Sequence, residues 1–383
     1  MLIQQLSSST FLSRILCILT LIWVLASVEF IALAESPQLV EQKDFGDGLI
    51  YSVFNHENTG NFYFVKLKLS SQKWQLTPTT NEKGVRRCGT VKELALRYNP
   101  DAQISVNASF FDTAKYPIGT VAIDGEILSL DNRKRTSLGI KTDGSAIIDI
   151  ITPRAFISSD DYFEPIWIWG YNQPTKKNAI IAYNSQNGDS VVNLPTEAEA
   201  LIIENNAVEK KVDAGKVAIP KDGLVLIFHG KSKAHLNRFK TGSSVTLGLV
   251  MPREWENTYA MVTGGPRLIN NARIVDLKDN TENFESGLFK PHRRTIAGLT
   301  WNDEVFIAVF PNPVTYENAT EILLTLNVKD AMGLDGGSSS SLWVNDQKLF
   351  NGPKNVPVAL SIVPRDTDKT KNPLPYFENK YWN

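Results

Sequence analysis

Residues 333–345 read GLDGGSSSSLWVN and place an acidic residue, two glycines and four serines between two apolar segments. Glycine accepts backbone conformations with positive φ, so Gly336 and Gly337 predict a tight turn between two strands. Because these residues carry no side chains, successive N–H groups could also line an anion-binding concavity. The stretch is therefore either a connecting turn or the floor of a pocket that presents the carboxylate of Asp335.

This stretch matches neither a nucleotide-binding P-loop nor the nucleophile elbow of a serine hydrolase. A P-loop requires a lysine after its last glycine, and no lysine follows Gly337. A nucleophile elbow requires G-x-S-x-G, and Ser340 stands where the final glycine is needed. The sequence also contains no H-E-x-x-H, C-x-x-C or EF-hand loop, so a dedicated transition-metal site has no support.

Short apolar runs on either side of this stretch predict a strand-rich fold. They are residues 62–70, 146–152, 165–171, 200–206, 223–230, 244–251 and 304–310. Helices are predicted at 90–99, with Thr90 as N-cap, and at 318–330, where Asn318 and Glu321 resemble a capping box. Strands do not alternate with helices, so we expect an α+β fold with a strand-rich mixed sheet core and a few helices.

Composition describes a folded globular protein and gives no reason to expect nucleic acid as a partner. Hydrophobic residues make up 42% and charged residues 21% of the 383 residues. The formal net charge is −1, so electrostatics favour neither nucleic acid nor an anionic membrane.

The N-terminus resembles a secretory signal peptide. Arg14 precedes a long apolar run that closes with Ala32-Leu33-Ala34, which predicts cleavage after residue 34. An uncleaved anchor helix is the alternative, because the run approaches membrane-spanning length. Cleavage would leave Cys88 as the single cysteine, a pattern that favours bacterial export. We expect a secreted, periplasmic or cell-envelope protein with no stable membrane insertion after cleavage.

The remaining chain predicts one large domain. We expect a signal peptide at 1–34, a domain at 35–365 and a C-terminal tail at 366–383. Residues 153–260 carry few polar motifs and are expected to form a peripheral subdomain or insert.

Two segments before the opening stretch combine glycine or amide groups with apolar flanks. In ISVNASFFD (104–112), Asn107 follows a short apolar strand and could bond a neighbouring loop or a ligand. In MVTGGPRLINNARI (261–274), Gly264 and Gly265 precede a proline and predict a sharp turn. Arg267 then either begins a plain hairpin or serves as an anion clamp.

A third segment, PHRRTIAGLTWN (291–302), gathers cationic side chains beside a hydroxyl. A run of charges is usually a solvated face. Arg294 next to Thr295 would nevertheless suit a phosphate, because a guanidinium binds such oxyanions through two parallel hydrogen bonds.

In chain order, these segments resemble the phosphodiester glycosidase family over roughly residues 45–365. The motifs that carry the resemblance are VNASFFD, YPIGTVAIDGEIL, TGGPRLI, HRRTIAG and ENATEILLTLNVKDAMGLDGGSSSSLW. Two positions depart from the family pattern: Arg293 stands where the family usually has proline, and Ser338 where it usually has a third glycine.

The resemblance implies hydrolysis of a sugar-1-phosphodiester, such as an N-acetylglucosamine-1-phosphodiester, to free sugar and phosphomonoester. The substrate could belong to a cell-wall or envelope glycopolymer. The implied catalytic residues are Asp335, Asn107 and Arg294, with Asp335 as acid/base or as stabiliser of an oxocarbenium-like transition state. The implied substrate- and phosphate-binding residues are Gly336, Gly337, Ser338, Thr295, Gly264, Gly265 and Arg267.

Several alternatives stay open on the sequence. Asp112 and Asp124 are candidates for a second carboxylate. No cofactor is certain and the metal is unknown, although Asp335 and Asn107 could hold calcium or magnesium through oxygen ligands. A non-catalytic carbohydrate-binding protein could use the aromatic residues Trp167, Trp169 and Tyr171. A serine hydrolase would pair Ser338 or Ser339 with His292.

Overall fold

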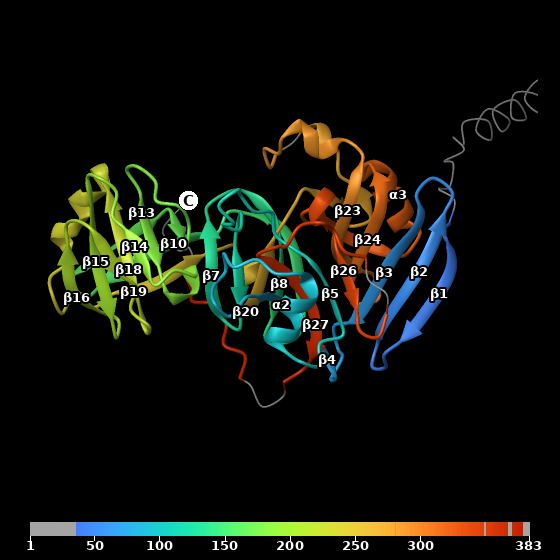
Figure 1. Ribbon diagram of the computed structural model, residues 1–383, viewed down its shortest axis with the longest axis horizontal. Coiled ribbons are helices and arrows are strands. Elements are labelled where there is room, and N and C mark those ends of the chain that lie inside the picture. Colours follow the sequence, from blue (N-terminus) through green and yellow to red (C-terminus); the bar gives the residue numbers. More distant parts are fainter. Residues whose placement is uncertain (1–35, 280, 348–349, 367–369, 378–383) are drawn as a thin grey trace, which may run out of the picture. The chain divides into compact units, whose positions relative to one another are not determined.

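The computed structural model describes residues 36–279, 281–347, 350–366 and 370–377 (Figure 1). The predicted signal peptide and the end of the tail lie outside the described residues. Contacts divide the chain into residues 1–35 and a unit of residues 36–383. Within the described ranges, none of the helices has both the length and the apolar character that crossing a bilayer requires.

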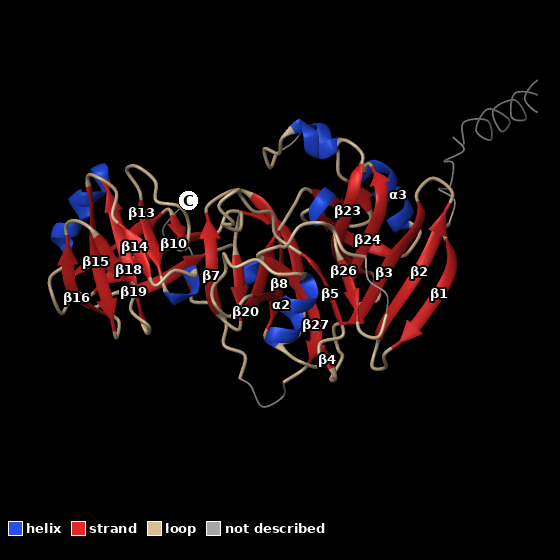
Figure 2. Cartoon of the chain, in the orientation of Figure 1, coloured by secondary structure: helices blue, strands red, loops and turns tan. Residues whose placement is uncertain are grey.

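Strands dominate the described residues (Figure 2), and they form sheets of eight, ten, four, four and two strands. In the order of pairing, the eight-stranded sheet contains β1 (Gln38–Asp44), β2 (Leu49–His56), β3 (Gly60–Lys68), β24 (Glu304–Val314), β23 (His292–Thr300), β25 (Val328–Gly333), β21 (Arg267–Asn270) and β22 (Arg273–Ile274). In the same sense, the ten-stranded sheet contains β16 (Ala207–Val212), β15 (Ala198–Glu204), β18 (Gly223–His229), β13 (Ile180–Tyr183), β12 (Gly170–Tyr171), β7 (Glu126–Asp131), β6 (Val121–Ile123), β20 (Thr258–Thr263), β8 (Arg135–Lys141) and β9 (Ala146–Ile151).

The smaller sheets complete the strand inventory. One four-stranded sheet pairs β26 (Leu342–Val344), β5 (Ile104–Asn107), β27 (Val358–Pro364) and β4 (Trp74–Thr80). The other pairs β11 (Tyr162–Ile168), β10 (Arg154–Ser159), β19 (Thr246–Val250) and β28 (Tyr376–Phe377), and β14 (Val191–Asn193) pairs with β17 (Lys216–Ala218). Most pairs are antiparallel, whereas β12–β13 and β19–β28 are parallel. The expected strand-rich, mixed-sheet architecture is confirmed.

Every predicted apolar run overlaps a strand, because each run is buried on at least one face of a sheet. The run 62–70 corresponds to β3, and 304–310 begins β24, its neighbour in the eight-stranded sheet. The run 165–171 is divided between β11 and β12, which belong to different sheets. Residues 153–260 supply β10–β19, and their status as an insert stays a prediction.

Helices are short and few among the described residues: α2 (Val91–Tyr98) and α3 (Tyr316–Leu324), with 3₁₀ turns elsewhere. The 3₁₀ turns are Ser185–Asn187, Gly230–Arg238, Arg253–Trp255, Leu277–Asp279, Ser286–Phe289 and Gly337–Ser339. The predicted N-cap of α2 is confirmed. Thr90 accepts from the backbone of Glu93, and the Glu93 side chain accepts from the Thr90 N–H, which completes a capping box.

The predicted helix at 318–330 is wrong at both ends. Thr315, not Asn318, is the N-cap, since its hydroxyl accepts from the Asn318 N–H at 3.2 Å. The helix ends at Leu324, and Asn327 adopts a left-handed conformation with φ 63°. Asparagine tolerates that conformation, which ends a helix. The chain then enters β25, which lies between β23 and β21.

Two apolar layers hold the eight-stranded sheet in place. One face packs Val65 and Ile307 with Val106 and Leu360 of the β5–β27 sheet. The opposite face packs phenylalanines of β3 and β24 beneath α3. Each large side chain buried in these layers contributes roughly 1.5–3 kcal/mol by leaving water. The first layer brings the end of β5 close to the end of β25, where the candidate site begins.

Candidate active site

A cavity of about 590 Å³ lies beyond the end of β25. This volume falls in the range of small-ligand sites. Its polar lining consists of Arg133, Arg135, Asn283, Glu285, His292, Arg294, Asp335 and Ser338, with the glycines 287, 336 and 337. Its apolar lining consists of Phe110, Ile118, Phe284 and Leu288. Five of the predicted site residues therefore line one cavity: Arg294 within β23, and Asp335, Gly336, Gly337 and Ser338, which follow β25.

Asp335 is anchored by its backbone and lines the cavity. Its N–H donates to the carbonyl of Ala108 at 2.9 Å, and the preceding Leu334 N–H donates to the carbonyl of Thr295 at 2.8 Å. Burial raises the pKa of the Asp335 carboxyl to about 6, although contacts with the Ser339 hydroxyl and the Gly336 N–H lower it. The carboxyl can therefore exchange a proton near neutral pH.

Arg294 is buried, with 1% of its surface exposed, and its guanidinium is held from several sides. Nε donates to the carbonyl of Val314 at 3.1 Å, and Nη2 donates to the carbonyls of Leu288, at 2.8 Å, and Lys290. The guanidinium also stacks on the ring of Tyr316 at 3.9 Å. Nη1 is buried and has no hydrogen-bond partner among the described residues, so this nitrogen keeps a free N–H donor.

The glycine turn comes close to this free nitrogen. A Cβ added to Gly336 would lie 3.9 Å from Nη1 of Arg294 and 2.9 Å from the carbonyl of Arg293. The Gly336 N–H donates to Oδ1 of Asp335 at 3.0 Å, so this N–H binds the Asp335 carboxylate. Gly337 has φ 61°, in the left-handed region that favours glycine. The turn thus brings Asp335 and Arg294 to the same part of the cavity.

Asn107 is fully buried and ties the turn to two strands. Its Nδ2 donates to the carbonyl of Asp335. Its Oδ1 accepts from the Thr295 hydroxyl at 2.7 Å and from the Ser341 N–H at 3.0 Å. Asn107 and Thr295 do not line the cavity. The geometry gives both residues a positioning role, because the amide holds the backbone that carries the carboxylate.

The pair Asp335 and Asn107 does not fit a calcium or magnesium site. Both lone pairs of the Asn107 carbonyl oxygen already accept hydrogen bonds, so that oxygen is not available as a metal ligand. In the described ranges, no group of three histidine, cysteine or acidic side chains could hold a metal ion.

Gly264 and Gly265 pack against the end of β25, outside the cavity lining. The Gly265 N–H donates to the carbonyl of Gly333 at 2.8 Å, and the Gly333 N–H donates to the carbonyl of Pro266 at 3.0 Å. A Cβ on Gly264 would come within 2.4 Å of that Gly333 carbonyl. The glycines allow this close approach and support β25 just before Asp335.

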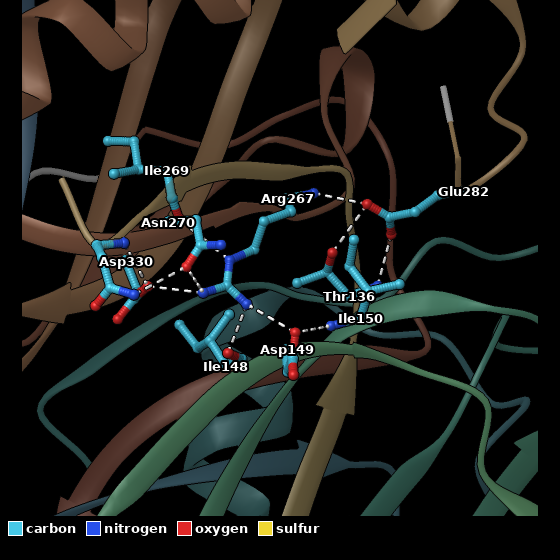
Figure 3. Close-up of polar contacts among 10 residues, drawn as sticks. Thr136, Ile148, Asp149, Ile150, Arg267, Ile269, Asn270, Glu282 and Asp330 are labelled. Carbon is cyan, nitrogen blue, oxygen red and sulfur yellow. Dashed lines mark hydrogen bonds and ion pairs between the residues drawn. The ribbon is translucent and has the colours of Figure 1, made fainter. Parts of the chain in front are cut away.

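Arg267 also lies outside the cavity lining, in an internal network (Figure 3). Its guanidinium donates to Asp330 at 2.7 Å, to Asp149 at 3.2 Å and to the carbonyl of Ile148 at 2.6 Å. Nε donates to the carbonyl of Ile269 at 3.1 Å. Arg267 therefore links β21, β25 and β9, and these carboxylates and carbonyls occupy the donors that an anion clamp would need.

The sequence reasoning missed Arg133 and Arg135. They lie in the basic run NRKR (132–135), whose last residue, Arg135, begins β8. Arg135 is 8% exposed and stacks on the ring of Phe284 at 3.9 Å. Arg133 forms an ion pair with Asp131 at 3.3 Å. A basic run is usually a solvated face, so the run by itself does not predict a binding site. The only signal in the sequence is that Arg135 adjoins an apolar, strand-like segment.

The other acidic candidates lie outside the cavity lining. Asp112 accepts from the Tyr116 N–H at 2.9 Å, and Asp124 accepts from the Tyr98 hydroxyl at 3.1 Å.

The residues of the rival functions do not assemble at the cavity either. His292 lines it, but its Nε2 bonds the carbonyl of Gly287 at 3.1 Å, and no hydrogen bond to Ser338 or Ser339 occurs among the described residues. The aromatic residues Trp167, Trp169 and Tyr171 lie on β11, on β12 or between them, and outside the cavity lining.

Comparison with protein families identifies residues 177–363, about half of the chain, as matching the phosphodiester glycosidase model. This part of the chain belongs to the phosphodiester glycosidase family. The matched range includes Gly264, Arg294 and Asp335, whereas Asn107 and Arg135 precede it. The resemblance inferred from the ordered motifs is confirmed.

Solved structures share the fold of this phosphodiester glycosidase-like chain at low sequence identity. A hypothetical protein from Synechocystis is 19% identical with a TM-score of 0.74, covering 87% of this chain and 65% of that one, so this chain spans about two thirds of its length. A protein from Burkholderia pseudomallei K96243, named as a putative exported protein, is 16% identical with a TM-score of 0.65. The match covers 82% of this chain and 74% of the Burkholderia chain. These two likenesses show the fold alone.

A third structure is more distant. It is the catalytic domain of zebrafish N-acetylglucosamine-1-phosphodiester alpha-N-acetylglucosaminidase, auto-inhibited by its pro-peptide. It is 13% identical with a TM-score of 0.42, and the match covers 87% of this chain and 85% of the zebrafish chain. No curated protein matches the sequence of this chain.

Proposed function

We propose that this protein hydrolyses the glycosidic bond of a sugar-1-phosphodiester and releases free sugar and a phosphomonoester. One observation carries the proposal: the carboxyl of Asp335 and the buried guanidinium of Arg294 line the same cavity. A phosphodiester has one negative charge beside a polar sugar ring, and this cavity offers a fixed cation and an ionisable carboxyl for those two parts. The family membership of residues 177–363 supports the same reaction class.

In this proposal, Arg294 holds the phosphate through Nη1, the nitrogen that the protein leaves unpaired. A guanidinium binds phosphate oxygens through charge-assisted hydrogen bonds, which are stronger than neutral ones. Stacking on Tyr316 fixes the plane of the guanidinium before substrate arrives. The Gly337 backbone and the Ser338 hydroxyl lie at the same wall and would contact the phosphate or the sugar.

Asp335 acts in its ionised form. It accepts a proton from the water that attacks the anomeric carbon, and its negative charge stabilises the oxocarbenium-like transition state. The bond between the anomeric carbon and the phosphate oxygen breaks, and the electron pair leaves with the phosphate. A phosphomonoester is a stable leaving group, so no second carboxyl has to donate a proton to it.

We place the reaction outside the cytoplasm, on an α+β fold of the phosphodiester glycosidase type. The signal-like N-terminus supports export, and the Burkholderia protein that shares the fold is named as exported. The substrate would then be an envelope or wall glycopolymer, or a soluble diester derived from one.

The test is hydrolysis of alkyl and p-nitrophenyl sugar-1-phosphodiesters by the purified protein in ¹⁸O-labelled water. We expect free sugar that carries the label and an unlabelled phosphomonoester. Asp335→Asn and Arg294→Gln should each reduce kcat/KM by roughly 10²–10³-fold. Asp112→Asn, which lies outside the cavity lining, is the control and should retain activity.

Three outcomes would contradict the proposal. Label in the phosphate would mean cleavage of the phosphorus–oxygen bond. Near-normal activity in both variants would remove Asp335 and Arg294 from the reaction. Binding of the glycan without turnover would favour the non-catalytic carbohydrate-binding protein.

A further inference from the structure

Arg135 repeats the surroundings of Arg294 at another wall of the same cavity. Both arginines are buried, and each guanidinium stacks on an aromatic ring at 3.9 Å, Arg135 on Phe284 and Arg294 on Tyr316. Each has a buried side-chain nitrogen without a hydrogen-bond partner in the described part of the chain, Nε of Arg135 and Nη1 of Arg294. Buried polar groups are nearly always paired, so an unpaired cationic donor in a cavity wall indicates a ligand.

Arg135 is held at this wall by a segment distant in sequence. Glu282 accepts from the N–H of Thr136 at 2.6 Å and from its hydroxyl at 2.9 Å, and so fixes the start of β8. The same carboxylate accepts from the Arg267 N–H at 2.7 Å. Phe284 follows Glu282 by two residues and supplies the ring beneath the guanidinium.

Burial of Arg135 has an electrostatic cost that a bound anion would offset. Desolvation lowers the pKa of the Arg135 guanidinium, and the nearby Glu282 carboxylate raises it. The Glu282 carboxylate accepts hydrogen bonds from Thr136 and from the Arg267 N–H, and no ion pair between Glu282 and Arg135 occurs among the described residues. The neighbouring Arg133 is different, because it is half-exposed and already paired with Asp131.

We propose that Arg135 contacts the substrate phosphate and forms with Arg294 a two-arginine clamp around it. This inference rests on the proposed function. A phosphodiester has two non-bridging oxygens, so two guanidiniums can bind it at once. When the glycosidic bond breaks, the phosphate gains a second negative charge. Arg135 would therefore bind the transition state more tightly than the ground state and act mainly on kcat.

The variant Arg135→Gln tests this clamp. We expect kcat on a sugar-1-phosphodiester to fall roughly 10²–10³-fold, with a smaller change in KM. Inorganic phosphate, measured by calorimetry on the intact protein, should bind at least about tenfold more weakly. Arg238→Gln is the matched control, since Arg238 also stacks on an aromatic ring at 3.9 Å, that of Tyr162, but does not line the cavity.

Each outcome separates the clamp from the proposed function. If wild-type protein hydrolyses the diester and Arg135→Gln leaves both kcat and phosphate affinity unchanged, the clamp is overturned and the function stands. If wild-type protein hydrolyses no sugar-1-phosphodiester but its phosphate binding depends on Arg135, the function is overturned and the anion contact stands. Equal losses in Arg135→Gln and Arg238→Gln would indicate a structural effect and overturn the clamp.

A variant that retains the charge covers the case in which Arg135→Gln fails to fold. Arg135→Lys keeps a cation but loses the planar group that stacks on Phe284 and forks to two oxygens. We expect it to fold with a melting temperature close to wild type and to lose roughly tenfold or more in kcat. Wild-type kcat in Arg135→Lys would overturn the clamp.

Discussion

At the scale of single residues, the candidate site combines groups that are costly to the folded chain. Asp335 has its pKa raised to about 6 by burial, and Arg294 is buried with one nitrogen unpaired. Neither arrangement stabilises the protein, because burial penalises charge and an unpaired donor forfeits a hydrogen bond. Perturbed groups that share a cavity are a frequent mark of catalytic sites.

Asp335 should set the pH dependence of the proposed reaction. The mechanism requires its ionised form, so kcat/KM should be lost as the pH falls through about 6 and reach a plateau above that value. A pH profile from 4 to 9 with a stable substrate analogue measures this. A profile that instead declines as the pH rises through 6 would assign Asp335 the role of proton donor.

The same shift predicts an opposite effect on stability. The folded pKa lies above the ordinary aspartate value, so folding favours the protonated carboxyl, and its contribution to stability is lost as the pH rises from about 4 to about 6. Asp335→Asn should therefore raise the melting temperature at pH 8 and change it little at pH 4. Equal shifts at both pH values would contradict the assignment.

Asn107 should be required for both stability and activity. Asn107→Ala removes three internal hydrogen bonds and leaves buried partners unpaired, which costs roughly 2–4 kcal/mol of unfolding free energy. We expect kcat to fall as well, because the backbone of Asp335 loses its anchor. Asn55→Ala, which removes one exposed contact to Asn61, is the control and should cost under about 0.5 kcal/mol. Full activity in a stable Asn107→Ala protein would exclude the positioning role.

At the scale of secondary-structure elements, the sequence predicts what is locally encoded and misses what distant partners decide. Apolar runs such as 304–310 predict strands because burial of the run follows from its composition. The capping box at Thr90 is also local. The end of α3 was missed, because Asn327 turns the chain into β25, and the strands on both sides of β25 come from elsewhere in the sequence.

The candidate site shows the same division. Asp335 and Arg294 are in motifs that the sequence displays, whereas Arg135 lies in a basic run without a distinguishing pattern. Its position in the cavity wall depends on Glu282, which accepts a hydrogen bond from Thr136, a residue 146 positions earlier in the chain. No spacing rule connects residues so far apart, so this wall could be recognised only in the folded chain.

The Gly264-Gly265 turn should tolerate no added side chain. Gly265 has φ 108°, and a Cβ there would lie 2.5 Å from Oε2 of Glu282 and 2.9 Å from the ring of Phe284. Gly265→Ala should therefore displace the segment that supports Arg135, cost roughly 1–3 kcal/mol and lower kcat. Gly215→Ala is the matched control, with φ 89° and no described atom within 4 Å of the added Cβ. Equal effects of the two substitutions would attribute the loss to backbone strain alone.

At the scale of the whole molecule, buried polar contacts join the eight-stranded sheet to the ten-stranded sheet. Arg267 begins β21 in the eight-stranded sheet and donates to Ile148 and Asp149 of β9 in the ten-stranded sheet (Figure 3). Glu282 bonds the N–H of this arginine and also Thr136 of β8. The cavity takes its walls from both sheets, so its shape depends on these ties.

Breaking the tie at Arg267 should therefore destabilise the protein more than it impairs chemistry. Arg267→Met leaves the carboxylate of Asp330 largely buried without its cation, which should cost roughly 3–5 kcal/mol in urea unfolding. The double variant Arg267→Met/Asp330→Asn removes that unpaired charge and should recover part of the loss. Arg154→Gln, an exposed arginine stacked on Trp167, is the control and should change stability little.

Activity distinguishes this positioning role from an anion clamp. At low temperature, where the double variant is folded, we expect kcat/KM within about tenfold of wild type, because Arg267 does not line the cavity and its donors face Asp330, Asp149 and backbone carbonyls. A loss as large as that of Arg294→Gln, together with weaker binding of inorganic phosphate, would instead place Arg267 on the substrate. If the double variant recovers stability and keeps its phosphate affinity, Arg267 has a structural role in joining the two sheets. A buried ion pair of that kind affects folding and does not contact the ligand.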